Sequence, residues 1–326
     1  MSRFWAIVQY ELLWNIRKKK FLGVVVIAFA LTTLSLALPV ILSNTTNQPL
    51  DRNPDYVVGS GVGIGGLGFF LFALVTVMDS ISGEFESGTV VTLLTKPVSR
   101  TMVFLGKLLA TFLTILTAYT ILYLYMAVGG TIVYGPQSNL HLVPISLLGD
   151  ILSTFVWVGL VLAIGSVSKS SIIVALGSFG IFLGLFIGAP IVSMFSEQAW
   201  VLSYVPGSGT IGFIKGLNPK TNFTHGMSIS TGTDYIATNS INCILYPSSE
   251  VTFFRMGMFT PVALSVIELY VYAMNSVLFG TTFIQGLYYM EMLSFVFLRS
   301  ILVASIYILA SLFVAWYAFK RAQVLE

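Results

Sequence analysis

The sequence predicts an all-α integral membrane protein with six transmembrane helices. The chain has 326 residues, of which 56% are hydrophobic and only 9% are charged, whereas a soluble domain carries about 25% charged residues. Its apolar runs extend over roughly 20 residues, the length of a helix that crosses a bilayer core. A membrane β-barrel would instead show segments of about ten residues that alternate apolar and polar. Helices are therefore the expected spanning form.

The apolar runs divide the chain into three parts. Residues 1–194 hold an N-terminal interfacial helix and the first five spans, residues 195–299 form an extracellular segment, and residues 300–326 hold the sixth span and a tail. The expected spans are residues 21–42, 57–78, 102–133, 143–167, 172–194 and 300–319.

Residues 2–20 predict an amphipathic helix at the membrane surface. Trp5, Val8, Leu12 and Ile16 recur at helical spacing among charged residues. The alternative interpretation is that these residues are only a basic flank of the first span.

The distribution of positive charge predicts a multi-pass protein of the plasma membrane with both termini in the cytoplasm. Eleven of the 16 Lys and Arg residues fall in the pieces that this orientation places inside, as the positive-inside rule requires. Two glycosylation triplets, at Asn44 and Asn222, fall on the predicted outer side. Membrane lipid is an expected partner.

The segment 195–299 is of mixed character. Residues 201–250 are rich in Gly, Ser, Thr, Asn and Tyr and indicate turns and short strands in water. Residues 257–298 are apolar again, and a seventh span over 262–283 would bury Glu268 in the bilayer at a cost of a few kcal/mol. We expect amphipathic helices on the outer membrane face instead.

A polar segment, residues 79–101, separates the second and third spans. Gly88-Thr89 can begin or break a helix and Pro97 ends one. Val90 and Leu94 give the residues between them an apolar face. The pattern predicts a short amphipathic helix on the cytoplasmic surface, with acidic residues on its N-terminal side, where they suit the helix dipole.

The order of residues in this segment resembles the permeases of type-2 ABC exporters. Their pattern is E-x-E-x-G-T, then Leu-Leu, then Pro-x-Ser-Arg, then Gly-Lys. Glu11 and Arg17 also resemble the "elbow" helix at the N-terminus of that family. The matching residues of the pattern are Glu84, Glu86, Gly88, Thr89, Leu93, Leu94, Pro97, Ser99, Arg100, Gly106 and Lys107.

The resemblance implies a cytoplasmic coupling helix that docks on a separate ATP-binding subunit. Glu84 and Glu86 would face basic residues of that partner, and Val90 and Leu94 would supply apolar contact. Arg100 and Lys107 would also contact that partner or instead pair with anionic lipid headgroups, and the sequence leaves both roles open. It further implies a homo- or heterodimer of permeases with two cytosolic ABC ATPase subunits, which bind the ATP and Mg²⁺.

The sequence predicts no catalytic site, metal site or bound cofactor in this chain. There is no G-x-x-x-x-G-K-[ST] motif, so ATP hydrolysis is expected in another chain. Cys243 is the one cysteine, and His141 and His225 are isolated. A net charge of +3 is too small to indicate nucleic-acid binding.

Small residues and one acid mark the predicted spans. Gly180, Gly184 and Gly188 form a stripe along the fifth span, either for packing within the chain or for a dimer interface or pathway wall. Residues 61–66 contain G-x-G-x-x-G inside an apolar run, which indicates helix packing. Asp150 is a candidate intramembrane acid, although we expect it at the wet outer boundary of the fourth span.

These observations predict the membrane subunit of an ATP-driven exporter, in which residues 195–299 cap or gate the substrate path. One alternative is a secondary transporter or channel, which would need coupling acids or discontinuous spans. Another is a receptor or anchor that binds through its extracellular segment. A membrane enzyme has no catalytic constellation in its favour.

Overall fold

The computed structural model divides the chain into two compact units, residues 1–181 with 304–326, and residues 182–303. The sequence predicted that the middle part of the chain begins after residue 194 and ends at residue 299. Each unit is described by itself. The structure describes residues 3–46, 49–50, 54–89, 98–189, 191, 203–207, 211–215, 228–230, 232–247, 250–254 and 288–322.

The first unit is helical. Six helices among the described residues are long and apolar enough to cross a membrane, and they correspond to the six predicted spans. Helix α9 ends in the second unit, and helix α13 begins in it. The helices are α1 (Arg3–Arg17), α2 (Lys19–Thr46), α3 (Tyr56–Ser60), α4 (Gly65–Val77), α5 (Ser82–Glu86), α7 (Arg100–Tyr134), α8 (Val143–Ser168), α9 (Ser171–Leu183) and α13 (Leu293–Arg321).

Aromatic side chains fill the centre of this unit, where α4 packs against α8 and α2. The ring of Phe70 meets that of Trp157 edge-on at 5.3 Å, and Phe72 meets Tyr119 in the same way at 5.1 Å. All four side chains are buried. By contrast, α2 and α13 leave many large apolar side chains exposed, as expected of helices whose solvent is lipid.

The second span is broken, and the prediction of one continuous helix over 57–78 is wrong. The chain runs from α3 through a turn into α4, because Gly61, Gly63 and Gly65 have φ angles of 57°, 68° and 61°. Glycine reaches this left-handed region without the steric cost that other residues meet there. The carbonyl of Val62 within the turn accepts a hydrogen bond from the Thr32 hydroxyl of α2 at 2.7 Å.

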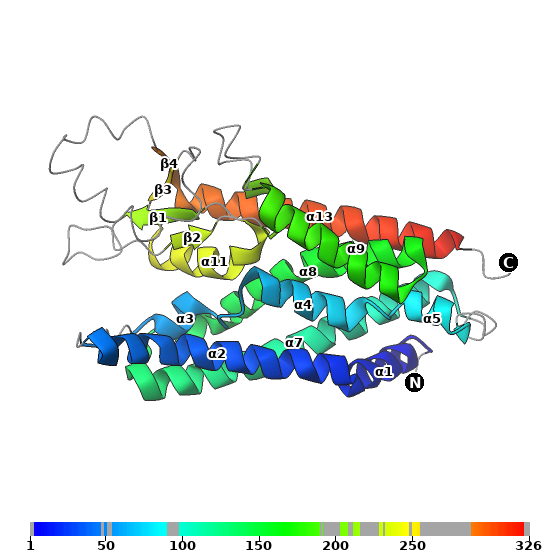
Figure 1. Cartoon of the computed structure of the whole chain (residues 1–326), viewed down its shortest axis with the longest axis horizontal. Coiled ribbons are helices and arrows are strands. Elements are labelled where there is room, and N and C mark those ends of the chain that lie inside the picture. Colours follow the sequence, from blue (N-terminus) through cyan, green and yellow to red (C-terminus); the bar gives the residue numbers. More distant parts are fainter. Residues whose placement is uncertain are drawn as a thin grey trace. The chain divides into compact units, whose positions relative to one another are not determined.

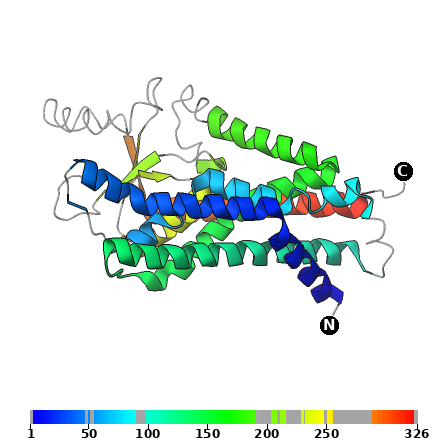
Figure 2. The same cartoon turned by 60° about the horizontal axis from the view of Figure 1, so that its bottom comes forward.

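Helix α1 leaves the line of α2 at a sharp angle (Figure 2) and packs along α7. The two helices are separated by Lys18, which is not helical. Gly106 of α7 makes the close approach possible, because a Cβ atom there would lie 2.8 Å from Cγ2 of Ile7. In Figure 1, α1, α5 and the C-terminal end of α13 lie at the same end of the first unit.

The second unit contains a four-stranded antiparallel sheet with the order β2-β1-β3-β4. The expectation of an all-α chain is therefore wrong for this unit. The described part of 257–298 begins with β4 rather than with an amphipathic helix, because β4 pairs with β3 in a register that sets Val251 opposite Glu291. The strands are β1 (Ile211–Lys215), β2 (Ser228–Ser230), β3 (Glu250–Phe254) and β4 (Tyr288–Met292).

A short helix and an ion pair accompany the sheet. Helix α11 (Ile236–Leu245) buries Ile236 and Ile241. After β4, α13 begins, and Arg299 pairs with Glu291 at 2.8 Å. Arg299 thus lies inside α13, which begins before the expected start of the last span at residue 300. The possible seventh span over 262–283 lies outside the described residues.

We expect Gly106→Val to destabilise the first unit by about 1–3 kcal/mol, because the added side chain overlaps Ile7 and forces α1 away from α7. Gly23→Val is the matched control, since a Cβ atom at Gly23 of α2 meets nothing within 4 Å. The midpoint of thermal unfolding in detergent checks this. Equal midpoints for the two variants would contradict the close contact between α1 and α7.

Candidate coupling site

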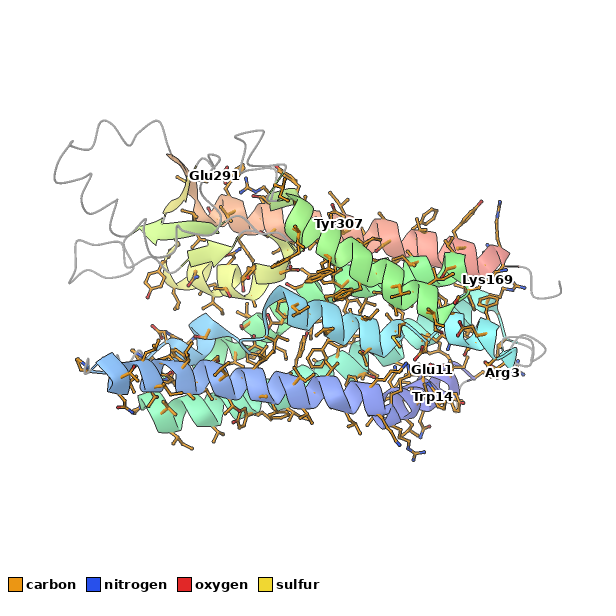
Figure 3. The ribbon with its side chains drawn as sticks, viewed as in Figure 1. Arg3, Glu11, Trp14, Lys169, Glu291 and Tyr307 are labelled. Carbon is orange, nitrogen blue, oxygen red and sulfur yellow. The ribbon has the colours of Figure 1, made fainter. Side chains whose placement is uncertain are left out.

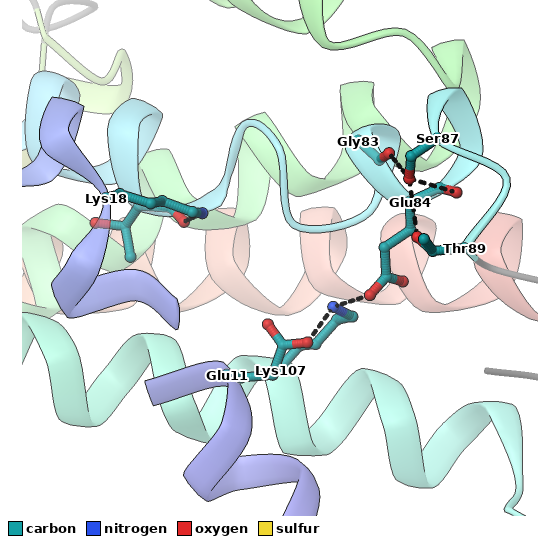
Figure 4. A network of polar contacts seen from close by, with 8 residues as sticks. Glu11, Lys18, Gly83, Glu84, Ser87, Thr89 and Lys107 are labelled. Carbon is teal, nitrogen blue, oxygen red and sulfur yellow. Dashed lines mark hydrogen bonds and ion pairs between the residues drawn. The ribbon is translucent and has the colours of Figure 1, made fainter. Parts of the chain in front are cut away.

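The centre of the candidate site is α5, a single helical turn that follows the second span. Gly88 has a φ angle of 69° just after the helix, a common way for a helix to end. The Ser87 hydroxyl donates to the carbonyl of Gly83 at 2.7 Å and contacts the Thr89 hydroxyl at 2.8 Å (Figure 4). Residues 86–89 are exposed. Gly88 thus ends α5, whereas Thr89 is helical again.

Lys107 of α7 joins α5 to α1 through two buried ion pairs (Figure 4). Its Nζ atom lies 2.6 Å from Oε1 of Glu11 and 2.7 Å from Oε1 of Glu84. The Lys107 and Glu11 side chains are only 4% and 7% exposed. At such burial a charge must be paired, and removal of one partner is costly. Three segments of the chain are thus held by one ammonium group.

The two carboxylates outnumber the ammonium, and other charges gather nearby. The second oxygen of Glu84 is buried and, within the described residues, has no hydrogen-bond partner. Lys18 donates to the carbonyl of Thr76 in α4 at 3.2 Å. Burial lowers the pKa of Lys18, and the negative charges of Asp79 and Glu11 oppose this effect. The junction between α1 and α2 therefore lies in the electrostatic field of Asp79 and of Glu11, which is also paired with Lys107.

Glu86 connects α5 to the fifth span. Its carboxylate accepts a hydrogen bond from the backbone N–H of Ser171 at 2.8 Å, at the first residue of α9. A carboxylate in this position satisfies a free helix N–H and suits the helix dipole. Ser82 adds a second connection, since its hydroxyl lies 3.2 Å from that of Ser171.

Phe85, between the two acids, contacts two further segments. The ammonium of Lys169 lies 5.4 Å from the centre of its ring, in the loop between α8 and α9. The ring of Phe319, near the end of α13, meets it edge-on at 6.5 Å. Three successive residues of one turn therefore contact three different sets of helices.

Arg100 anchors the other end of the polar segment. Its guanidinium donates to the carbonyl of Ala322 at 2.6 Å and to that of Lys320 at 3.1 Å, at the end of α13. These carbonyls have no partner within the helix, and a cation suits them. Ser99 caps α7, because its hydroxyl accepts from the N–H of Met102.

The structure corrects two of the expected roles in this segment. Glu84 faces the helix bundle and pairs with Lys107, so it does not present its charge to a partner. Lys107 is buried and does not reach lipid headgroups. Arg100 likewise contacts the end of α13. Val90, Leu94 and Pro97, and with them the predicted surface helix, lie outside the described residues.

Helix α1 shows which signal was missed in the sequence. Its buried face consists of Val8, Glu11 and Asn15, whereas Trp5 and Trp14 are 46% and 56% exposed. Figure 3 shows Glu11 toward the other helices and Trp14 on the outer side. Residues 8, 11 and 15 have the spacing of one helix face. Because Glu11 is on this buried face, its carboxylate needs a buried cation as a partner, and this is the signal that the sequence contained.

Two remaining residues of the N-terminal region are exposed. Arg17 lies in the last turn of α1, where a cation suits the helix dipole. Asn44 lies in the last turn of α2 and is accessible for glycosylation, and Asn222 lies outside the described residues.

The glycine stripe does not serve packing among the described residues. A Cβ atom at Gly180, Gly184 or Gly188 would meet nothing within 4 Å, so the first of the two predicted roles is not seen. The chain from Gly184 to Gly188 is a π-helical turn. A role in a dimer interface or pathway wall stays a prediction.

Asp150 is buried, and the expectation that it lies at a wet boundary is wrong. It lies about two turns inside α8 and is 4% exposed. The Tyr123 hydroxyl of α7 donates to its Oδ2 atom at 2.7 Å and also contacts the Ser146 hydroxyl at 2.6 Å. Gly61, in the break of the second span, lies near this group, since a Cβ atom added there would be 3.4 Å from the Tyr123 oxygen.

No group of three or more His, Cys, Asp and Glu side chains that could hold a metal ion occurs in the described ranges. His141 lies exposed in a short turn before α8.

Comparison with known families identifies the class of protein. The sequence profile of the ABC-2 family transporter proteins matches residues 5–324, nearly the whole chain. The chain belongs to this family and is a multi-pass membrane protein. Members of the family are membrane components of ABC transporters. No curated protein sequence matches the chain.

We expect Lys107→Met to destabilise the protein by about 3–5 kcal/mol, because it leaves Glu11 and Glu84 buried without their cation. The matched control is Lys20→Met, which removes a lysine whose side chain is 62% exposed and whose pair with Asp79 spans 3.7 Å. Such a pair contributes at most about 1 kcal/mol.

The thermal unfolding midpoint of the purified protein measures both effects. Addition of Glu84→Gln to Lys107→Met is expected to restore part of the loss, since one unpaired charge disappears. If Lys107→Met and Lys20→Met unfold at the same temperature, the buried cation does not hold these helices together.

Proposed function

We propose that this chain is the permease subunit of an ATP-driven exporter and forms the substrate path together with a second copy or a related chain. Its partner would be a cytosolic ATPase subunit that binds ATP and Mg²⁺. Membership of the ABC-2 family and six candidate spans support this proposal. No catalytic role is assigned to the chain itself.

The observation that carries the proposal is the connectivity of α5. Within one turn, Glu84 contacts Lys107 of α7, which also pairs with Glu11 of α1, Phe85 contacts the α8–α9 loop and α13, and Glu86 contacts α9. A displacement of this turn acts on all of these helices together, because buried ion pairs and packed rings have discrete arrangements and do not stretch. The turn is therefore suited to transmit motion of an ATPase to the spans.

The exposed residues 86–89 are the proposed contact with the ATPase. In the sequence they belong to the segment for which the family resemblance implies a coupling helix, directly after the second span. Helix α1, with its exposed Trp5 and Trp14, would lie in the membrane interface, where tryptophan is enriched. In this proposal α1, α5 and the C-terminal end of α13 face the cytoplasm.

A second candidate function is secondary transport. The broken second span and the buried Asp150 are the features that such a transporter needs. ATP decides between the candidates. Uptake into inside-out vesicles that requires ATP and the ATPase subunit supports the exporter, whereas uptake driven by an ion gradient alone supports the secondary transporter.

We expect Ser87→Arg with Glu86→Lys to reduce copurification of the ATPase subunit by about tenfold or more, since charge reversal at the centre of an interface costs about 2 kcal/mol. The matched control is Asn44→Lys, which changes an exposed residue in the last turn of α2. Affinity purification in mild detergent with quantitative mass spectrometry measures the ratio. Unchanged recovery of the ATPase in the double variant would refute docking at 86–89.

A further inference from the structure

Asp150 is a buried acid that the proposed coupling mechanism does not use. It is 4% exposed in α8, inside a candidate span. The ion pairs within the described ranges involve other acids, namely Glu11, Asp79, Glu84 and Glu291. An ionised carboxylate buried without a counter-charge costs far more than a folded protein can supply, so the group must acquire a positive partner or a proton.

The helices packed around Asp150 offer no cation. It is the one titratable residue of α8, and residues 57–78 of the second span contain none. Helix α7 presents Tyr123 and, through the Thr154 hydroxyl, Tyr119. Lys107 lies about four turns away along α7, where it is already paired with two acids. His141 is exposed in the turn before α8.

The turn at Gly61 passes close to the carboxyl group. A Cβ atom at Gly61 would lie 3.4 Å from the Tyr123 oxygen and 3.9 Å from Oδ2 of Asp150. A proton needs no additional space, whereas an ammonium group or a hydrated metal ion does.

We propose that Asp150 is a proton-binding site inside the membrane-spanning bundle and carries its proton in the conformation described here. Binding forms an O–H bond on a carboxylate oxygen, and release returns the proton to water. The Ser146, Tyr123 and Asp150 oxygens form a hydrogen-bonded row with spacings of 2.6 and 2.7 Å. Each hydroxyl can donate in either direction, so the row accommodates both protonation states.

The break in the second span is a place where a movement could change the protonation state of Asp150. Gly61 is part of the turn between α3 and α4, and a Cβ atom added to it would be in van der Waals contact with the Tyr123 and Asp150 oxygens. A movement of this turn would admit water to the carboxyl group and favour its ionisation, because the charged form needs solvation. The proposal does not depend on the ATPase and concerns the full chain alone.

Infrared difference spectroscopy of the purified full chain in lipid nanodiscs tests the proposal. At neutral pH the wild type is expected to show the carbonyl stretching band of a protonated carboxyl group, and Asp150→Asn is expected to lose it. Tyr123→Phe should keep the band at a shifted frequency, because it removes a hydrogen bond and leaves the acid in place. Glu291→Gln, in the second unit, is the matched control and should leave the band unchanged.

A neutral-pH spectrum in which Asp150→Asn removes only carboxylate bands would overturn the proposal. If Asp150→Asn fails to fold, the frequency shift in Tyr123→Phe assigns the band, and a band unmoved by Tyr123→Phe would count against Asp150. Copurification of an ATPase is measured in parallel. Its absence with the band present would refute the exporter and leave the proton site standing.

Discussion

The pairing of one buried ammonium with two carboxylates from distant segments determines the arrangement of the first unit. Lys107 can satisfy both Glu11 and Glu84 only if α1 and α5 both approach α7 at this residue. The high cost of an unpaired buried charge makes this arrangement specific, since a shifted helix would leave an acid uncompensated. Gly106, one residue earlier, supplies the space that α1 needs.

The apolar runs predicted the six spans because lipid imposes length and composition on every spanning helix. They did not predict the break at Gly61–Gly65, since glycine in an apolar run is equally compatible with close helix packing. The sheet in the second unit was only partly foreseen: residues 288–292 are apolar enough for a helix, and pairing with β3 makes them a strand.

The pattern of residues in the polar segment predicted where the candidate site lies in the sequence. It did not predict the directions in which the side chains of the site point. Whether Glu84 faces a partner or the bundle depends on the rotation of α5 and on a lysine 23 residues later. Long-range pairing of this kind leaves no local signal. Asp150 was recognised as unusual, and its burial depends on Tyr123 and on the turn at Gly61, which the sequence places far apart.

Because α5 is a single turn with several contacts, the number of residues between α4 and α5 is constrained. Each added residue rotates a helix by about 100°, so an insertion between Met78 and Ser82 would move Glu84 toward the position of Phe85 and disconnect every contact of the turn together. Substitutions there remove contacts one at a time. The segment should therefore vary in side chains during evolution while its number of residues stays constant.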